Sequence, residues 1–220
     1  MILAQISVTR ALAINGKQRG MIARIGLGAR IGLAGVLALS LSGCISLGGG
    51  KAPPTLVTLT AASAAPTGTN VSGSLKEALV IAEPETDRRL AVQRIPVQID
   101  DANVAYLQNA QWVERPARLF RGLLAETIRA KTGRLVVEDN QAEATGSTRL
   151  AGRLLDMGYD ARRQSVVVRY DAIREGAGGT ITTRRFEAVV PGVQPKTEFV
   201  GPALNQAANQ VAQQVADWVN

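Results

Sequence analysis

The first 44 residues constrain the fold most, because residues 1–43 resemble a segment that is removed before the rest of the chain folds. Residues 1–43 contain no Asp or Glu and five basic side chains, and residues 31–41 read IGLAGVLALSL. A basic segment followed by an apolar run of this length is typical of a secretory signal peptide. The sequence therefore predicts a leader over residues 1–43, with Met21 as an alternative start, and leaves 177 of the 220 residues to fold outside the cytoplasm.

Cys44, the only cysteine of the chain, ends this segment. The tetrapeptide LSGC at residues 41–44 resembles the bacterial lipobox, in which the cysteine receives a diacylglyceryl group and the leader is cleaved before it. The resemblance implies cleavage after Gly43 and a covalent lipid on Cys44. Residues 44–54 would then be a lipidated, flexible, glycine-rich tether. Because residue 45 is Ile rather than Asp, the expected location is the outer membrane, with the protein on its periplasmic face.

An uncleaved transmembrane helix is the alternative interpretation of this region. Residues 31–50 are uncharged over twenty positions, which is long enough to span a bilayer. However, glycines at 43, 48, 49 and 50 disfavour a helix in the second half, and the apolar residues thin out after Leu47. The leader is therefore the preferred interpretation.

The overall charge of +7 does not indicate a nucleic-acid partner. The leader holds five of the 25 basic residues and none of the 18 acidic ones, so the mature chain carries only +2. This is not the electrostatic signature of a nucleic-acid-binding protein, and eight aromatic residues offer little for base stacking.

The absence of histidine argues against most enzyme classes. It removes the usual general base and the commonest zinc ligand, and the scattered carboxylates are better explained as solvated surface. We expect no catalytic residues, no metal and no cofactor apart from the lipid on Cys44. A cell-wall enzyme that uses carboxylate, Lys, Ser or Thr chemistry is the less favoured alternative.

Residues 55–220 are predicted to form one periplasmic domain. Apolar and β-branched runs predict strands, and the last three form an antiparallel meander. The predicted strands are 55–59, 79–82, 90–95, 104–107, 135–138, 148–157, 164–174 and 180–190, with turns or loops at 61–73, 83–89 and 100–103.

Two amphipathic helices complete the domain. Apolar residues at three-and-four spacing follow Pro116 and stop at Gly133, with Arg118, Arg121 and Arg129 on the polar side. A last helix is predicted to open at Gly201-Pro202, with a narrow apolar stripe that needs only the sheet as its partner. Asn205, Gln206, Asn209, Gln210 and Gln213 form its opposite face. The predicted fold is an α+β two-layer sandwich, with an antiparallel or mixed sheet and two helices packed on one face.

Alternation assigns the two faces of the meander. The residues expected to face the helices are Leu150, Leu154, Val166, Val168, Tyr170, Phe186, Ala188 and Val190. The other face carries Arg149, Arg153, Arg169 and Arg185 together with Asp171 and Glu187. Arg184 falls on the apolar face in this register, so we expect it at a strand end unless the register is wrong nearby.

The order of these features resembles the ABC-type transport auxiliary lipoproteins. The resemblance rests on the lipobox, the TLVTLT strand, the V-x-R-I-P-V to Y-L-Q segment over residues 92–107, Trp112 with Glu114, the amphipathic helix, the meander and the last helix. It implies a non-enzymatic subunit anchored in the outer membrane that serves a lipid transporter with mammalian-cell-entry (MCE) domains. Its partners would be the MCE protein, permease and ATPase, with phospholipid and a homo-oligomer as further possibilities.

Tyr106, Leu107 and Trp112 are the candidate residues for partner or lipid contact, because aromatic side chains with a polar tip suit interfaces. For Trp112, a packing role at the helix entrance is the competing interpretation. A different function is also open, in which the protein binds anionic lipid or lipopolysaccharide, or serves outer-membrane assembly. In that function the four arginines of the sheet would bind phosphate groups, although cross-strand ion pairs are the favoured explanation for these arginines.

Overall fold

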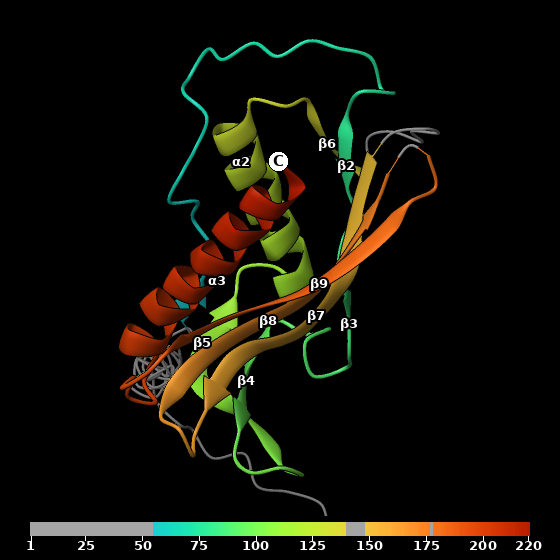
Figure 1. Ribbon diagram of the computed structural model, residues 1–220. Coiled ribbons are helices and arrows are strands. Elements are labelled where there is room, and N and C mark those ends of the chain that lie inside the picture. Colours follow the sequence, from blue (N-terminus) through green and yellow to red (C-terminus); the bar gives the residue numbers. More distant parts are fainter. Residues whose placement is uncertain (1–54, 140–147, 177) are drawn as a thin grey trace, which may run out of the picture. The chain divides into compact units, whose positions relative to one another are not determined.

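The long strand β7 (Thr148–Asp160) is the strand around which the sheet is built in the computed structural model (Figure 1). The structure describes residues 55–139, 148–176 and 178–220, so the predicted leader, Cys44 and the predicted tether lie outside the described residues. The remaining elements are β1 (Thr55–Val57), β2 (Leu79–Ile81), β3 (Glu85–Thr86), β4 (Arg94–Gln98), β5 (Val104–Trp112), α2 (Pro116–Thr132), β6 (Val136–Glu138), β8 (Ser165–Glu175), β9 (Ile181–Val190) and α3 (Thr197–Val219).

The two edges of β7 are paired in different ways. Along one edge, β2, β3 and β4 pair with it in parallel, one after another. Along the other edge, β8 pairs in antiparallel orientation, and β9 follows β8. β5 is antiparallel to β4, and β1 and β6 add parallel strands to β5 and β2. The sheet is therefore mixed and open, and both helices lie on one face of it, which confirms the predicted α+β sandwich (Figure 1).

The predicted register of the meander is confirmed. Leu154 pairs with Tyr170, which pairs with Phe186, and all three are nearly inaccessible to solvent. Arg184 is the fourth residue of β9 and pairs with Ala172, so its expected position at a strand end is wrong although the register holds. Its side chain is exposed, with the guanidinium 5.2 Å from the Phe186 ring.

The helix α2 agrees with its prediction except at Arg121. Its start at Pro116 and its left-handed C-cap at Gly133 (φ 64°) are as expected. Arg121, however, is buried rather than on a solvated side, and its Nε lies 2.8 Å from a carboxylate oxygen of Glu138 in β6. A buried guanidinium needs such a partner, and the pair ties the helix to the sheet edge.

The predicted start and packing of α3 are wrong. The helix begins at Thr197 and contains Pro202, and its buried surface includes Ala207, Ala212 and Ala216 beside the predicted apolar stripe. These small residues let α3 pack against α2 as well as against β8 and β9. The sequence pattern missed this second contact because alanines do not stand out as an apolar stripe.

The segment between β2 and α2 also differs from the prediction. Residues 90–93 form turns and bends, and the strand runs over Arg94–Gln98 instead of 90–95. Asp87 accepts hydrogen bonds from the amides of Arg89 and Leu90, and these bonds favour a turn there. In addition, Glu85–Thr86 forms the short β3 within the predicted turn, and β5 continues to Trp112 rather than ending at Leu107.

Candidate functional site

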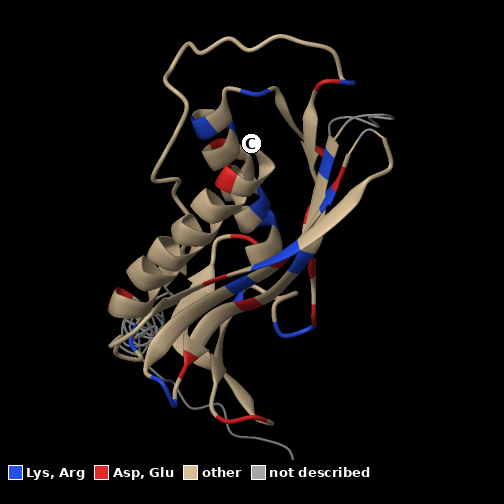
Figure 2. Cartoon of the chain, viewed as in Figure 1, with Lys and Arg blue, Asp and Glu red and all other residues tan. Residues whose placement is uncertain are grey.

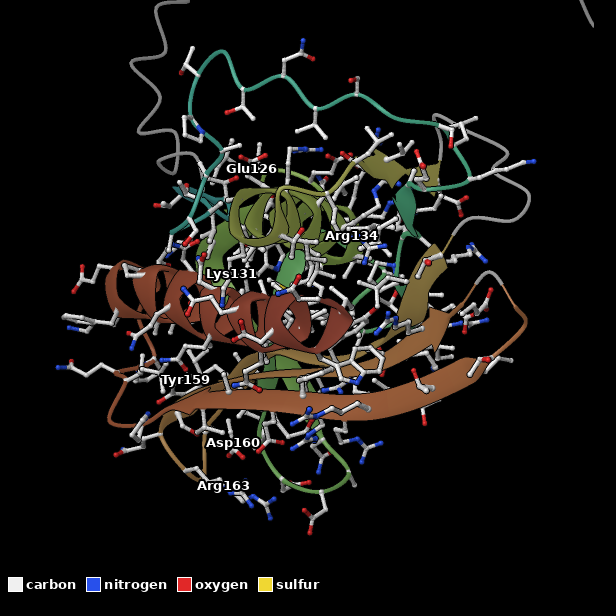
Figure 3. All side chains as sticks on the ribbon, turned by 45° about the horizontal axis from the view of Figure 1, so that its top comes forward. Glu126, Lys131, Arg134, Tyr159, Asp160 and Arg163 are labelled. Atoms are coloured by element: carbon white, nitrogen blue, oxygen red, sulfur yellow. The ribbon has the colours of Figure 1, made fainter. Side chains whose placement is uncertain are left out.

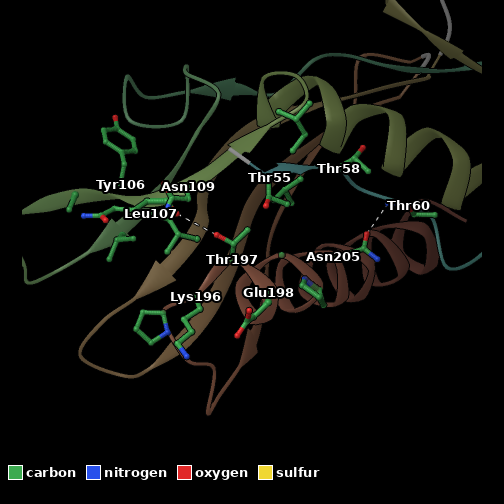
Figure 4. A pocket seen from close by; sticks show the side chains of 18 residues that line it. Thr55, Thr58, Thr60, Tyr106, Leu107, Asn109, Lys196, Thr197, Glu198 and Asn205 are labelled. Carbon is green, nitrogen blue, oxygen red and sulfur yellow. Dashed lines mark hydrogen bonds between the residues drawn. The ribbon is translucent and has the colours of Figure 1, made fainter. Parts of the chain in front are cut away.

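A groove of about 1050 Å³ lies between β5, β1 and the start of α3 (Figure 4). Three segments line most of it, namely residues 55–60, residues 105–109 and the stretch from Pro195 to Asn205. Its volume is at the upper end of the range for small-molecule pockets, but the groove is open along one side. Lys196 and Glu198 are the only charged residues that line it among the described residues, and both are exposed.

A bulge in β5 shapes one wall of the groove. Arg94 pairs with Gln111 and Pro96 with Tyr106, so residues 107–110 of β5 lie opposite the single residue Ile95. Asn109 has a positive φ of 56°, a conformation that Asn tolerates better than most side chains. The extra residues interrupt the pairing of β5 with β4 beside the groove.

The start of α3 forms the opposite wall of the groove, and Thr197 connects this wall to β5. Its hydroxyl donates a hydrogen bond to the Gln108 carbonyl at 3.4 Å (Figure 4). Gly201 brings the helix close to β1, since a Cβ at this position would lie 3.7 Å from the methyl groups of Val57. The helix α3 therefore contacts β5 at Thr197 and β1 at Gly201.

Two asparagines of α3 fix the chain that follows β1. The side-chain oxygen of Asn205 accepts a hydrogen bond from the Thr60 amide at 2.8 Å (Figure 4). Asn209 is buried, accepts from the Ala62 amide at 2.7 Å and donates to the Thr60 carbonyl at 2.9 Å. Sequence reasoning placed both on a solvated face; their spacing of four residues was the only signal that they act together.

Two of the three candidate contact residues are among those that line the groove. Tyr106 is half-buried, with the Arg94 guanidinium 4.2 Å from its ring centroid, and it points away from α3 (Figure 4). Leu107 lines the groove and is 9% exposed. Trp112 is only 1% exposed and belongs to the hydrophobic core, so packing accounts for it. Cys44 lies outside the described residues.

Basic and acidic residues both occur along the long strands of the sheet (Figure 2), and three of the arginines on its open face form ion pairs. Arg185 binds Asp171 with nitrogen–oxygen distances of 2.6 and 2.7 Å, and Arg169 lies between Glu187 and Asp156. The hydrogen bonds from Arg185 hold the pKa of Asp171 below its usual value. Arg149 pairs with Asp139 at 2.7 Å. The favoured explanation by ion pairs is confirmed for these three arginines.

A similar ion-paired cluster closes the end of the sheet near Tyr159 (Figure 3). Asp160 and Arg163 flank this end, and the guanidinium of Arg162 lies 2.7 Å from Asp101. Across residues 55–139, 148–176 and 178–220, no group of three or more acidic, Cys or His residues could hold a metal ion. Within the same residues, no helix is long and apolar enough to cross a membrane.

Comparison with known proteins agrees with these features. The sequence profile of the family described as ABC-type transport auxiliary lipoprotein component matches residues 58–216. No curated protein sequence matches the chain significantly.

Two solved structures share the fold. A crystal structure of an uncharacterized protein has a TM-score of 0.59 at 13% identity and covers 76% of this chain and 100% of its own. A protein of the family DUF330 from Xanthomonas campestris has a TM-score of 0.56 at 19% identity and covers 76% of this chain and 92% of its own. Since the profile match over residues 58–216 covers more than half of the chain, from just after β1 to near the end of α3, the chain belongs to the family of ABC-type transport auxiliary lipoprotein components.

Proposed function

We propose that this protein is a non-enzymatic, lipid-anchored subunit of an MCE-linked ABC transport system that moves lipid between the inner and outer membranes. The family match over residues 58–216 carries the proposal. Cys44 attaches the protein to the periplasmic face of the outer membrane, and residues 44–54 link that anchor to the domain. ATP hydrolysis belongs to another subunit, since the chain has no GxxxxGK[ST] sequence.

The groove is the proposed contact site for the rest of the system. It contains Tyr106 and Leu107 and begins at Thr55, the first described residue after the tether. The alternative function in anionic-lipid or lipopolysaccharide binding needs free guanidinium groups on the open face of the sheet. Arg169 and Arg185 already bind carboxylates there, which disfavours that alternative.

Affinity purification from the envelope tests this function. The full-length protein, tagged at its carboxyl terminus, is extracted in mild detergent, and its partners and amino-terminal peptide are analysed by mass spectrometry. We expect an acylated Cys44 peptide together with an ATPase, a permease and an MCE-domain protein. The variant Cys44→Ala should lose the acyl mass and leave the membrane fraction. An unmodified Cys44, or the absence of transporter subunits, would contradict the proposal.

A further inference from the structure

The outer edge of β5 presents main-chain hydrogen-bonding groups to the groove. In the β4–β5 hairpin, the Ile99 amide donates to the Asn103 carbonyl at 3.0 Å. Because main-chain groups in an antiparallel pair alternate in direction, Ala105 points its groups at β4, whereas Val104 and Tyr106 point theirs away from it. Val104 and Tyr106 therefore offer main-chain hydrogen-bond donors and acceptors on the side of β5 that faces away from β4.

Gln108 continues this pattern, and farther along the strand the same edge already pairs with β1. Its carbonyl accepts the Thr197 hydroxyl from the groove side, so its amide also points outward. Beyond the bulge, the Val113 amide donates to the Val57 carbonyl of β1 at 2.9 Å. β1 covers only residues 110–112 of β5. Among the described residues, no strand pairs with the outer edge of residues 104–109.

The groove runs along this edge and is not confined to one face of the strand, although it also includes Val97 of β4. All five consecutive residues from Ala105 to Asn109 line it. Side chains of a strand alternate between faces, so a groove over one face would be lined by every second residue only. An occupant of the groove thus lies beside the main chain of β5.

Apart from the bulge at residues 107–110, the edge lacks the side chains that normally prevent strand pairing. Natural edge strands carry charges or prolines, and β9, the strand at the opposite side, carries Arg184, Arg185 and Glu187. Residues 104–109 read VAYLQN and contain neither a charge nor a proline. Alternating amide and carbonyl groups are satisfied by another polypeptide strand, whereas an acyl chain would leave them unpaired.

We infer that an extended, uncharged polypeptide segment of another transporter subunit adds to β5 along residues 104–108 and fills the groove. The largely neutral lining favours an uncharged segment, with Lys196 and Glu198 at its border. The inference rests on the proposed function for the identity of the partner. The chemistry of recognition, by main-chain hydrogen bonds, follows from the edge itself.

Photo-crosslinking in cells tests the inference with a matched pair of variants. A benzoyl-phenylalanine at the exposed groove residue Thr58 is introduced into the full-length protein, alone and with Gln108→Ala or Gln108→Pro. Alanine keeps the outward amide, and proline removes it without touching the pairing with β4. We expect peptide adducts from a transporter subunit in the first two proteins and about a tenfold loss with Gln108→Pro, from one lost donor and one unpaired acceptor.

Each other outcome overturns the inference. Adducts with phospholipid, with a second copy or with residues 45–54 of the same chain identify a different occupant, and equal adducts in both Gln108 variants exclude main-chain recognition. If the wild-type protein does not co-purify with transporter subunits, the proposed function fails. If it does and Gln108→Pro co-purifies equally, only strand addition fails.

Hydrogen exchange gives a second readout that needs no substitution. The wild-type protein is compared alone and within the isolated complex, by mass spectrometry of the peptide that contains residues 104–109. Added protection of this peptide in the complex is expected, since three outward amides become bonded. Unchanged exchange overturns strand addition even if Gln108→Pro proves unable to fold.

Discussion

At the scale of single residues, substitutions of Trp112 distinguish a role in packing from a role in partner contact. Its side chain is 1% exposed, so Trp112→Ala should lower the free energy of unfolding by about 3–5 kcal/mol. Trp112→Phe should cost clearly less, because the indole N–H has no hydrogen-bond partner among the described residues and its removal leaves nothing unpaired. Urea denaturation followed by circular dichroism measures both values. Tyr106→Ala is the control and should change stability by less than about 1 kcal/mol, as expected for a half-buried side chain.

Two buried tyrosines predict a loss of stability at high pH. The Tyr170 hydroxyl donates to the Ala151 carbonyl at 2.8 Å, and the Tyr159 hydroxyl donates to the Val193 carbonyl at 2.7 Å. Burial raises the pKa of both side chains because it disfavours the phenolate. A raised folded pKa means that the stabilisation is complete below the unfolded value of about 10 and is lost as pH rises above it.

Denaturation midpoints in urea from pH 8 to pH 11.5 test this. We expect a steep decline above about pH 10, together with late ionisation of Tyr159 and Tyr170 by absorbance at 295 nm. The variant Tyr170→Phe should show a shallower decline. If Tyr170→Phe leaves both the decline and the late ionisation unchanged, the burial argument is wrong.

At the scale of elements, Asn209 is predicted to connect α3 to the segment after β1. Its side chain makes hydrogen bonds with the main chain of Thr60 and Ala62 and with the Asn205 carbonyl. Asn209→Ala should therefore lower the free energy of unfolding by about 1–3 kcal/mol and speed amide exchange over residues 60–62. Gln210→Ala, at an exposed position of the same helix, is the control and should leave both measurements unchanged. Equal behaviour of the two variants would rule out the connection.

The elements that could be predicted are those with a regular apolar pattern. The meander and α2 agree with the sequence because their buried positions recur with the period of a strand or a helix. β4 was misplaced because side-chain hydrogen bonds of Asp87 favour a turn where a strand was expected. The start of α3 was misplaced because Pro202, taken for a residue of the first turn, lies inside a helix that begins at Thr197. The periodicity of apolar residues records neither feature.

The groove could be predicted only in part. The sequence singled out Tyr106, Leu107 and Trp112 as candidates for partner or lipid contact, and the first two line the groove. The bulge at Asn109 and the hydrogen bond from Thr197 create its shape, and they depend on β5 meeting a helix nearly ninety residues later in the chain. Such long-range pairing has no local sequence signal.

At the scale of the whole molecule, the proposed lipid anchor at Cys44 would limit where a partner can bind. Ten residues separate Cys44 from Thr55, which itself lines the groove, so a fully extended link would reach about 36–40 Å. A folded chain of about 166 residues has a radius of gyration of about 15 Å. With the proposed anchor, a link of this length would keep the groove clear of the membrane surface while the domain remains near it.

Shortening this link should therefore block partner binding without blocking lipidation. Deletion of residues 46–52 keeps the LSGC sequence but reduces the reach to about 13–14 Å, less than the size of the domain. We expect unchanged acylation and thermal stability, and about a tenfold lower recovery of transporter subunits, because the headgroups would obstruct the groove. Insertion of ten Gly and Ser residues at the same place should leave recovery within about twofold, since the effective concentration falls only slowly with linker length. Equal recovery with the shortened and the natural link would mean that the partner binds a surface remote from Thr55.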